Sequence, residues 1–181
     1  LIDMKEFEQT ILIEPRKFND ERGCFYETFK ESDFESFKLK QINESVSKKG
    51  VLRGLHFQRG EHAQAKMVRC LKGAIFDVAV DLRKDSPSFG HSTSVYLSGD
   101  SDIIFYIPRG FAHGFLALED NTKIQYFCDN EYNKESEGGV AYDDPMFKIG
   151  WPEVEGGYII SDKDKKYKYL NKFNIDEILK D

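Results

Sequence analysis

The chain of 181 residues has the length of a single domain, and its 40% of hydrophobic residues suffice for a sizeable core. The net charge of −6 argues against a nucleic-acid-binding protein, which would more often be basic. No stretch approaches the roughly 20 apolar residues of a membrane span, and the first ten residues lack the apolar run of a signal peptide. We therefore expect one cytoplasmic domain over residues 1–181, with no nucleic-acid and no membrane partner.

The first predicted element is a short helix, because Ser32 followed by Glu35 resembles a capping box before Phe34 to Phe37. Most of the following chain reads as β-strand, in keeping with its 15 Phe and nine Tyr. The predicted strands, separated by turn signals, are residues 51–58, 66–71, 75–82, 94–97, 103–107, 115–118 and 122–127.

The strand predicted over residues 75–82 alternates, with Asp77 and Asp81 on one face and apolar side chains on the other. Short strands at such regular spacing indicate a sandwich or barrel, and the lack of alternating βα units argues against a Rossmann-type sheet. The last predicted element is a helix through Leu179, since Asn174 followed by Glu177 resembles another capping pattern.

The three cysteines are odd in number and have no metal-type spacing. We predict buried thiols in a reducing compartment rather than a disulfide framework. They are Cys24, Cys70 and Cys128.

His56 lies among apolar neighbours in the strand-like run of residues 51–58. Two interpretations are open on local sequence alone. The ring can be a core histidine satisfied by a carbonyl, or it can be a general base, because an imidazole titrates near neutral pH.

His113 ends a Pro-x-Gly-x-x-His pattern that begins at Pro108, a spacing found in the second motif of metal-binding cupin barrels. The first cupin motif would need a His-x-His pair, but Gln58 follows two positions after His56. Because a metal site needs several converging ligands, we predict no metal here. The remaining histidines, predicted to be solvated, are His62 and His91.

Motifs of one known family occur in order along nearly the whole chain, and the run of residues 51–58 is the most specific of them. The matching segments are residues 20–23, 41–45, 50–58, 64–68, 73–90, 108–115, 149–152 and 160–164. On these segments the chain resembles the dTDP-4-dehydrorhamnose 3,5-epimerase family. The resemblance implies a mainly β fold, a cupin-like antiparallel β-barrel (jelly roll) with a few short peripheral helices. It also implies a homodimer in which the N-terminal strand bearing Arg22 and Phe25 exchanges between subunits.

The resemblance further implies an epimerase that inverts C3, C5 or both of a nucleotide-diphosphate sugar carrying a 4-keto group, without a cofactor. By resemblance His56 is the catalytic base and Asp164 orients it. Lys66 matches the lysine near the keto oxygen, and Tyr126 matches the acid. Positions that match substrate-binding residues are Arg22, Phe25, Glu27, Gln41, Asn43, Arg53, His113, Glu137 and Lys163, with Arg53 and His113 at the diphosphate.

This chemistry explains the residue types. Removing a proton next to a ketone makes an enolate, and a donor at its oxygen is worth about 3–4 kcal/mol. Inversion requires a second proton-carrying group on the opposite face of the sugar. Local sequence alone is equally compatible with a solvated Lys66, a solvated Asp164 in the charged segment 162–166, and a packed Tyr126.

Arg53 and His56 are an odd number of positions apart and would point to opposite faces of a regular strand. For both to reach one cavity, the strand must be irregular, and we predict the irregularity at Gly54.

Two positions depart from the family pattern and leave the nucleotide open between dTDP, the family default, and GDP. Glu131 stands where many members carry an aromatic residue associated with the base, with Tyr132 at the next position, and Phe127 stands where many carry a lysine. Alternative functions are a single-centre epimerase and a ketoisomerase. From other classes, a non-catalytic nucleotide-sugar-binding barrel and a metal-dependent cupin oxygenase remain.

Overall fold

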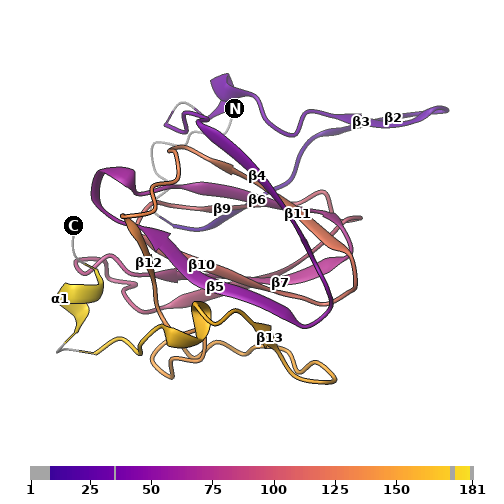
Figure 1. Cartoon of the computed structure of the whole chain (residues 1–181). Coiled ribbons are helices and arrows are strands. Elements are labelled where there is room, and N and C mark those ends of the chain that lie inside the picture. The colour runs from indigo at the N-terminus through magenta and orange to yellow at the C-terminus, as the bar shows by residue number, and fades with distance from the viewer. Residues whose placement is uncertain (1–8, 35, 172–173, 180–181) are drawn as a thin grey trace.

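Two β-sheets stacked face to face form the body of the molecule in the computed structural model, which describes residues 9–34, 36–171 and 174–179 (Figure 1). The first sheet has the order β1 (Ile11–Ile13), β9 (Ile104–Ile107), β6 (Lys66–Lys72), β11 (Thr122–Cys128) and β4 (Gln41–Ser47). The second sheet has the order β12 (Glu137–Gly139), β5 (Val51–Gln58), β10 (Phe111–Ala117), β7 (Ala74–Asp81) and β8 (Ser92–Ser98). The short strand β13 (Ile159–Ile160) pairs parallel to β5.

This arrangement confirms the predicted mainly β, cupin-like jelly roll. Each strand range expected from the sequence overlaps an observed strand, although β10 begins four residues earlier than expected, at Phe111. Sequence patterns did not predict β1, β4, β12 or the hairpin of β2 (Lys17–Asp20) and β3 (Gly23–Tyr26). That hairpin extends away from both sheets (Figure 1).

Three apolar layers hold the sheets. Between the sheets, side chains such as Val68, Phe115 and Ile124 form one buried cluster. The outer face of the second sheet packs under the C-terminal segment, and the outer face of the first packs under the N-terminal segment, where Phe34 and Phe37 are buried. Each fully buried apolar side chain of this size contributes about 1.5–3 kcal/mol. The predicted face split of residues 75–82 is confirmed for Phe76, Val78, Val80 and Leu82, which face the outer cluster, whereas Ile75 and Ala79 lie in the cluster between the sheets.

The first predicted helix is wrong. The described chain forms a 3-10 turn, η2 (Glu31–Asp33), which follows Lys30, so Ser32 lies inside the turn and does not occupy the capping position. Glu35 lies outside the described residues. Burial of Phe34 and Phe37 decides this segment, because both rings pack onto the first sheet.

The predicted C-terminal helix is present as α1 (Ile175–Ile178). Asn174 precedes it, but its side chain does not cap the helix. It binds the preceding chain instead, accepting from the Asn171 amide at 2.8 Å and donating to the Tyr169 carbonyl at 2.9 Å. A helix this short depends on tertiary packing. Two further 3-10 turns are η3 (Gly60–His62) and η4 (Asp164–Lys166).

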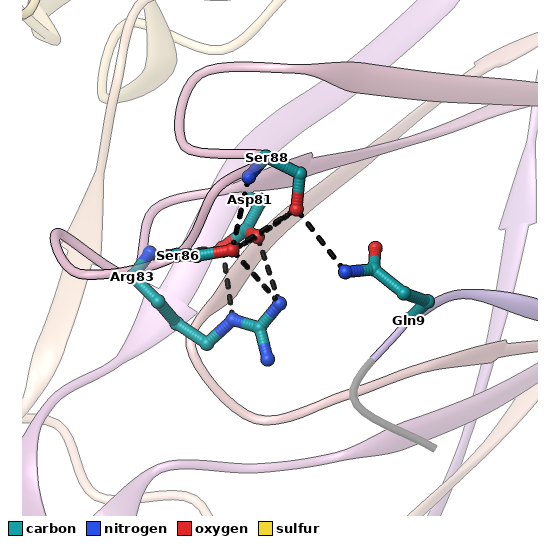
Figure 2. Close-up of polar contacts among 5 residues, drawn as sticks. All are labelled: Gln9, Asp81, Arg83, Ser86 and Ser88. Atoms are coloured by element: carbon teal, nitrogen blue, oxygen red, sulfur yellow. Dashed lines mark hydrogen bonds and ion pairs between the residues drawn. The ribbon is translucent and has the colours of Figure 1, made fainter. Parts of the chain in front are cut away.

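Hydrogen bonds to Asp81 stabilise the connection from β7 to β8, as Figure 2 shows. Arg83 donates to both carboxylate oxygens of Asp81, at 2.9 and 2.7 Å, and the hydroxyls of Ser86 and Ser88 donate at 2.6 and 2.7 Å. Gln9 adds a bond to Ser88 at 3.2 Å. Burial opposes ionisation, but these bonds outweigh it and lower the pKa of Asp81 to about 2.

Two of the three cysteines are buried as predicted, whereas Cys24 is exposed on the hairpin, which corrects that prediction. Among the described residues, no helix has the length and apolar character to cross a membrane.

Candidate active site

Strand β5 contains the predicted irregularity. His113 of β10 lies opposite His56, but Phe115 lies opposite Arg53. Two steps along β10 therefore correspond to three along β5, which is a β-bulge. The extra residue lets Arg53 and His56 face the same side.

Gly54 lies at the bulge with φ +120°, a backbone conformation that favours glycine. A Cβ there would come within 2.6 Å of the Gly114 Cα atom. Leu52 and Leu55, on either side of Gly54, are both buried in the same outer cluster, as the bulge requires. The sequence-based prediction of an irregularity at this position is confirmed.

His56 is paired with a buried carboxylate. Its Nε2 lies 2.7 Å from Asp164 Oδ1, and Asp164 is only 4% exposed. The Gly54 amide donates to the other oxygen, Oδ2, at 3.0 Å, and the Asp164 amide donates to the Ser161 hydroxyl at 3.1 Å. Burial opposes ionisation of Asp164, but the bonds from His56 and Gly54 prevail and lower its pKa. Asp164 is therefore not a solvated member of a charged segment.

A cleft of about 300 Å³ opens beside His56. His56 belongs to the second sheet, whereas Lys66 and Tyr126 reach the cleft from the first, so the cleft lies between the two. The residues that line it are Gln41, Asn43, His56, Phe57, Gln58, Gln64, Lys66, Tyr126, Tyr132 and Glu137. The structure thus brings together six of the residues expected from the sequence.

Lys66 and Tyr126 are neighbours on their shared wall. Lys66 Nζ lies 6.0 Å from the centre of the Tyr126 ring, and both side chains are half-buried. Burial lowers the pKa of Lys66, while nearby Cys128, Asp77 and Glu137 act in the opposite direction. Burial also raises the pKa of Tyr126, which keeps the phenol protonated at neutral pH.

Glu137 organises another wall of the cleft. Its Oε1 lies 2.5 Å from Lys163 Nζ, and its Oε2 accepts a bond from the Tyr132 hydroxyl at 2.9 Å. Burial opposes ionisation of Glu137, but these two partners lower its pKa. Tyr132 is held by its amide, which donates to Gln41 Oε1 at 2.8 Å.

A histidine on a buried carboxylate, a facing phenol and a half-buried amine can together move protons at a carbon beside a carbonyl. A family model described as dTDP-4-dehydrorhamnose 3,5-epimerase matches residues 4–172 of the chain. The chain belongs to this family. The resemblance and the epimerase activity predicted from the sequence are confirmed.

Relatives in the dTDP-4-dehydrorhamnose 3,5-epimerase family agree in sequence and structure. The enzyme of that name from Escherichia coli (strain K12) is 47% identical, over 97% of this chain and 94% of its own. A dTDP-6-deoxy-D-glucose-3,5-epimerase from Legionella pneumophila, solved with dTDP-4-keto-L-rhamnose, has 43% identity and a TM-score of 0.87, covering 94% of this chain and 92% of its own. A 3'-monoepimerase from Streptomyces bikiniensis, solved with dTDP-quinovose, has 31% identity and a TM-score of 0.85, covering 94% and 88%.

The positions that depart from the family pattern lie apart from the cleft wall. Phe127 is buried on the outer face of the first sheet, where its ring stacks on Phe29 at 5.7 Å. Glu131 is exposed, whereas Tyr132 lines the cleft. At this place in the chain, Tyr132 is therefore the aromatic side chain that lines the cleft.

Arg53 and His113 are not among the residues that line this cleft. Arg53 donates to the Ser47 hydroxyl at 3.2 Å and lines a neighbouring hollow together with His56 and Asp164. His113 is buried, and its Nε2 lies 2.6 Å from Asp77 Oδ1.

Three of the expected substrate-binding residues lie in or next to the N-terminal hairpin, and the structure of the single chain does not bring them to the cleft. Arg22 binds Asp20 within the hairpin turn, and Phe25 is 68% exposed on β3. Glu27 lines a different hollow at the base of the hairpin. The hairpin projects away from both sheets (Figure 1), so nothing in one chain carries these side chains to His56.

Three neighbours of the site were missed from the sequence. Asp77 pairs with His113, and the Tyr167 ring packs edge-on against His56 with 5.8 Å between centres. Gln64 lines the cleft and donates to the Asn130 carbonyl at 2.9 Å. A signal existed only for Asp77, because an aspartate on the inner face of an alternating strand requires a partner.

Proposed function

We propose that this chain converts dTDP-4-dehydro-6-deoxyglucose to dTDP-4-dehydrorhamnose by inverting C3 and C5 of the sugar. The observation that carries the proposal is the meeting of His56, Lys66 and Tyr126 around one cleft, with His56 held by Asp164. The substrate class comes from the relatives, one of which is named for dTDP-4-dehydrorhamnose and another of which is solved with dTDP-4-keto-L-rhamnose.

His56 takes the proton from the carbon beside the ketone. Its Nε2 is bound to Asp164, which leaves Nδ1 to receive that proton. Asp164 then stabilises the imidazolium and fixes the ring. Because Asp164 already accepts from Gly54, it stays anionic while the imidazole is neutral.

Lys66 stabilises the negative charge that develops on the ketone oxygen. Burial makes its ammonium costly in the empty cleft, but an enolate beside it favours the protonated form. A charge-stabilising donor of this kind is worth about 3–4 kcal/mol of the barrier.

Tyr126 returns a proton to the opposite face of the same carbon. It reaches the cleft from the first sheet while His56 reaches it from the second, so the sugar ring would lie between them. The raised pKa of Tyr126 keeps the phenol protonated until the enolate forms. The reaction needs no cofactor in this proposal, because no hydride moves.

Deuterium wash-in tests the proposal. We expect dTDP-4-keto-6-deoxyglucose, incubated with the protein in heavy water, to gain deuterium at C3 and C5 and to give the rhamno product. His56→Ala should abolish incorporation. Tyr126→Phe should permit exchange at a carbon but lose inversion, because His56 can return the proton only to its own face.

His62→Ala is the matched control, since His62 does not line the cleft and lies beside the exposed Glu61, so the variant should leave both rates unchanged. Deuterium at one carbon alone would indicate a single-centre epimerase, like the 3'-monoepimerase with the same fold. A ketoisomerase would move the carbonyl itself. If neither the dTDP sugar nor the GDP sugar gained deuterium, the result would indicate a non-catalytic binding barrel.

The assembly belongs to the same proposal: a homodimer in which the β2–β3 hairpin of one protomer reaches the cleft of its partner. The hairpin projects from the body and exposes Phe18 and Phe25, while Ile42 and Val46 are exposed on β4, an edge strand. Exposed apolar edges of this kind favour pairing. Light scattering should find a dimer for the wild type and a monomer for Phe25→Asp. A monomeric wild type would contradict the assembly.

We also infer that the chain forms a single domain and acts in the cytoplasm. Its three cysteines are free thiols, which suits a reducing compartment. One cooperative unfolding transition and recovery of activity from the cytosolic fraction would be the expected results.

A further inference from the structure

A second side chain besides Asp164 packs against the ring of His56. The ring of Tyr167 meets it edge-on, with 5.8 Å between the ring centres and 71° between the ring planes. Tyr167 belongs to the C-terminal segment and is half-buried. It is not among the residues that line the cleft, so its effect on a bound sugar must pass through a residue that is, and its ring contacts His56.

One short turn supplies both contacts to His56. Asp164 begins the 3-10 turn η4, and the Tyr167 amide closes it by donating to the Asp164 carbonyl at 3.3 Å. Side chains three positions apart lie on the same side of such a turn. The carboxylate and the phenol ring therefore approach His56 together. The Asp164 amide, which donates to the Ser161 hydroxyl at 3.1 Å, holds the start of the turn in place.

The Tyr167 ring occupies space that a missing side chain leaves open. Gly139 of β12 is the direct partner of His56 across the β5–β12 ladder. Side chains of directly opposed residues are neighbours on one face of a sheet. A Cβ on Gly139 would come within 2.3 Å of the Tyr167 ring atoms Cε2 and Cζ, so the ring lies against the glycine backbone. Glycine at this position thus gives the Tyr167 ring access to the side of His56.

The hydrogen bond to Asp164 does not by itself fix the orientation of the His56 ring. It holds one ring atom, Nε2, at 2.7 Å, but the χ2 torsion of histidine has broad minima, so the ring plane can still turn about that contact. A general base must keep its lone pair directed at the C–H bond, because misplacement by about 1 Å can cost about 10²-fold in rate. A ring packed against the imidazole restricts this rotation.

We propose that Tyr167 is a positioning residue whose ring fixes the plane of the His56 ring and keeps Nδ1 directed into the cleft. The inference rests on the proposed role of His56 as the base. Burial raises the pKa of Tyr167, so its phenol is neutral at pH 7 and acts on the imidazole by packing rather than by charge. The role therefore requires the ring of Tyr167 and not its hydroxyl.

Steady-state kinetics with dTDP-4-keto-6-deoxyglucose test the role of the ring. Leucine keeps apolar volume but has no planar ring, so we expect Tyr167→Leu to lower kcat about tenfold or more while KM and the Kd for dTDP stay within about twofold. Tyr167→Phe keeps the ring and should retain kcat within about twofold. A normal kcat in Tyr167→Leu would overturn the proposal. An equal loss in both variants would also overturn it, because the effect would then belong to the hydroxyl.

Gly139→Ala tests the same contact from the other side. In the otherwise unchanged protein its Cβ should displace the Tyr167 ring and lower kcat. Leucine lacks the ring atoms Cε2 and Cζ that this Cβ would meet, so adding Gly139→Ala to Tyr167→Leu should cause little further loss. Losses that simply multiply would mean that Gly139 affects the cleft without Tyr167, and would contradict the proposal.

Tyr158→Leu is the matched control for lost packing. Tyr158 is also half-buried and packs edge-on against Tyr142, with 6.1 Å between the ring centres, but it does not line the cleft. Its substitution should lower the Tm about as much as Tyr167→Leu does and leave kcat unchanged. If kcat fell equally in the two variants, lost stability alone would explain the result and the proposal would be wrong.

A crystal structure of Tyr167→Leu separates this proposal from the proposed function, because it requires no turnover. We expect His56 to keep its contact with Asp164 but to adopt more than one ring orientation. A single, unchanged orientation would overturn the proposal. Failure of the proposed function would instead appear as absence of deuterium incorporation by the wild type.

Discussion

The two histidine–carboxylate pairs of this protein occupy adjacent strands, yet their surroundings give them different properties. The pair of His56 and Asp164 lies on the cleft wall, with an amide on the second carboxylate oxygen. The pair of His113 and Asp77 lies deeper and has no such donor among the described residues. The comparison shows that two neighbouring pairs of the same residue types differ in burial and in the hydrogen bonds that satisfy the carboxylate.

Replacing His56 tests the pair of His56 and Asp164 and should reduce activity more than any other substitution. We expect His56→Asn to lower kcat by about 10³-fold or more, because the proposed general base is lost. The dTDP affinity should change little. Steady-state kinetics and calorimetry measure both. A near-normal kcat in this variant would show that His56 is not the general base.

Replacing the carboxylate of the same pair should have the next largest effect. Asp164→Asn keeps the size of the side chain but removes the charge that stabilises the imidazolium, so kcat should fall about 10²-fold with a smaller change in KM. A variant with an unchanged kcat would contradict this role of Asp164.

His113→Gln sharpens the comparison from the side of the deeper pair. Glutamine keeps a hydrogen-bonding group but loses the imidazole contact with Asp77, so we expect the Kd for dTDP to rise up to about tenfold while kcat stays within a few-fold. Calorimetry and steady-state kinetics measure the two effects, and an unchanged Kd would remove His113 from the proposed binding site.

Acid unfolding compares the stability of the wild type with that of Asp164→Asn. The folded-state pKa of Asp164 is lowered, so its charge stabilises the fold above the unfolded value of about 3.9, and this contribution is lost as pH falls through the folded value. Asp164→Asn should cost about 1–3 kcal/mol at pH 7 and progressively less below pH 4. Denaturant titrations at pH 7 and pH 3 give the two differences. An unchanged difference at pH 3 would contradict the assignment.

The smallest effect is expected at a third histidine–carboxylate contact. His62 Nε2 lies 3.8 Å from Glu61 Oε1, but Glu61 is almost fully exposed. Water screens such a pair, so His62→Gln should change stability by less than about 0.5 kcal/mol and kcat not at all. A clear loss of activity would mean that proximity to a carboxylate matters more than burial.

Much of the fold could be predicted from the sequence, because alternation in segments such as residues 75–82 is a local property. The bulge at Gly54 was also predictable, since two roles at an odd spacing required it. The absence of the helix predicted at Ser32 could not be foreseen from the sequence, because the conformation there depends on the packing of Phe34 against the first sheet.

The site was predictable where family motifs carried it and unpredictable where it depends on long-range contacts. Nothing local to Asp164 distinguishes it from its charged neighbours, and its burial appears only when residues 108 positions apart meet. The pairing of Asp77 with His113 likewise needs the register of β7 and β10.

The extra residue in β5 has a consequence for comparing sequences. On the two sides of Gly54 the strand alternates in opposite phase, so inward and outward positions must be counted separately for each half. A related chain lacking one residue there could keep every recognisable motif and still turn its arginine away from its histidine. In such a chain the spacing of three between these residues, more than their presence, would tell whether the catalytic pocket survives.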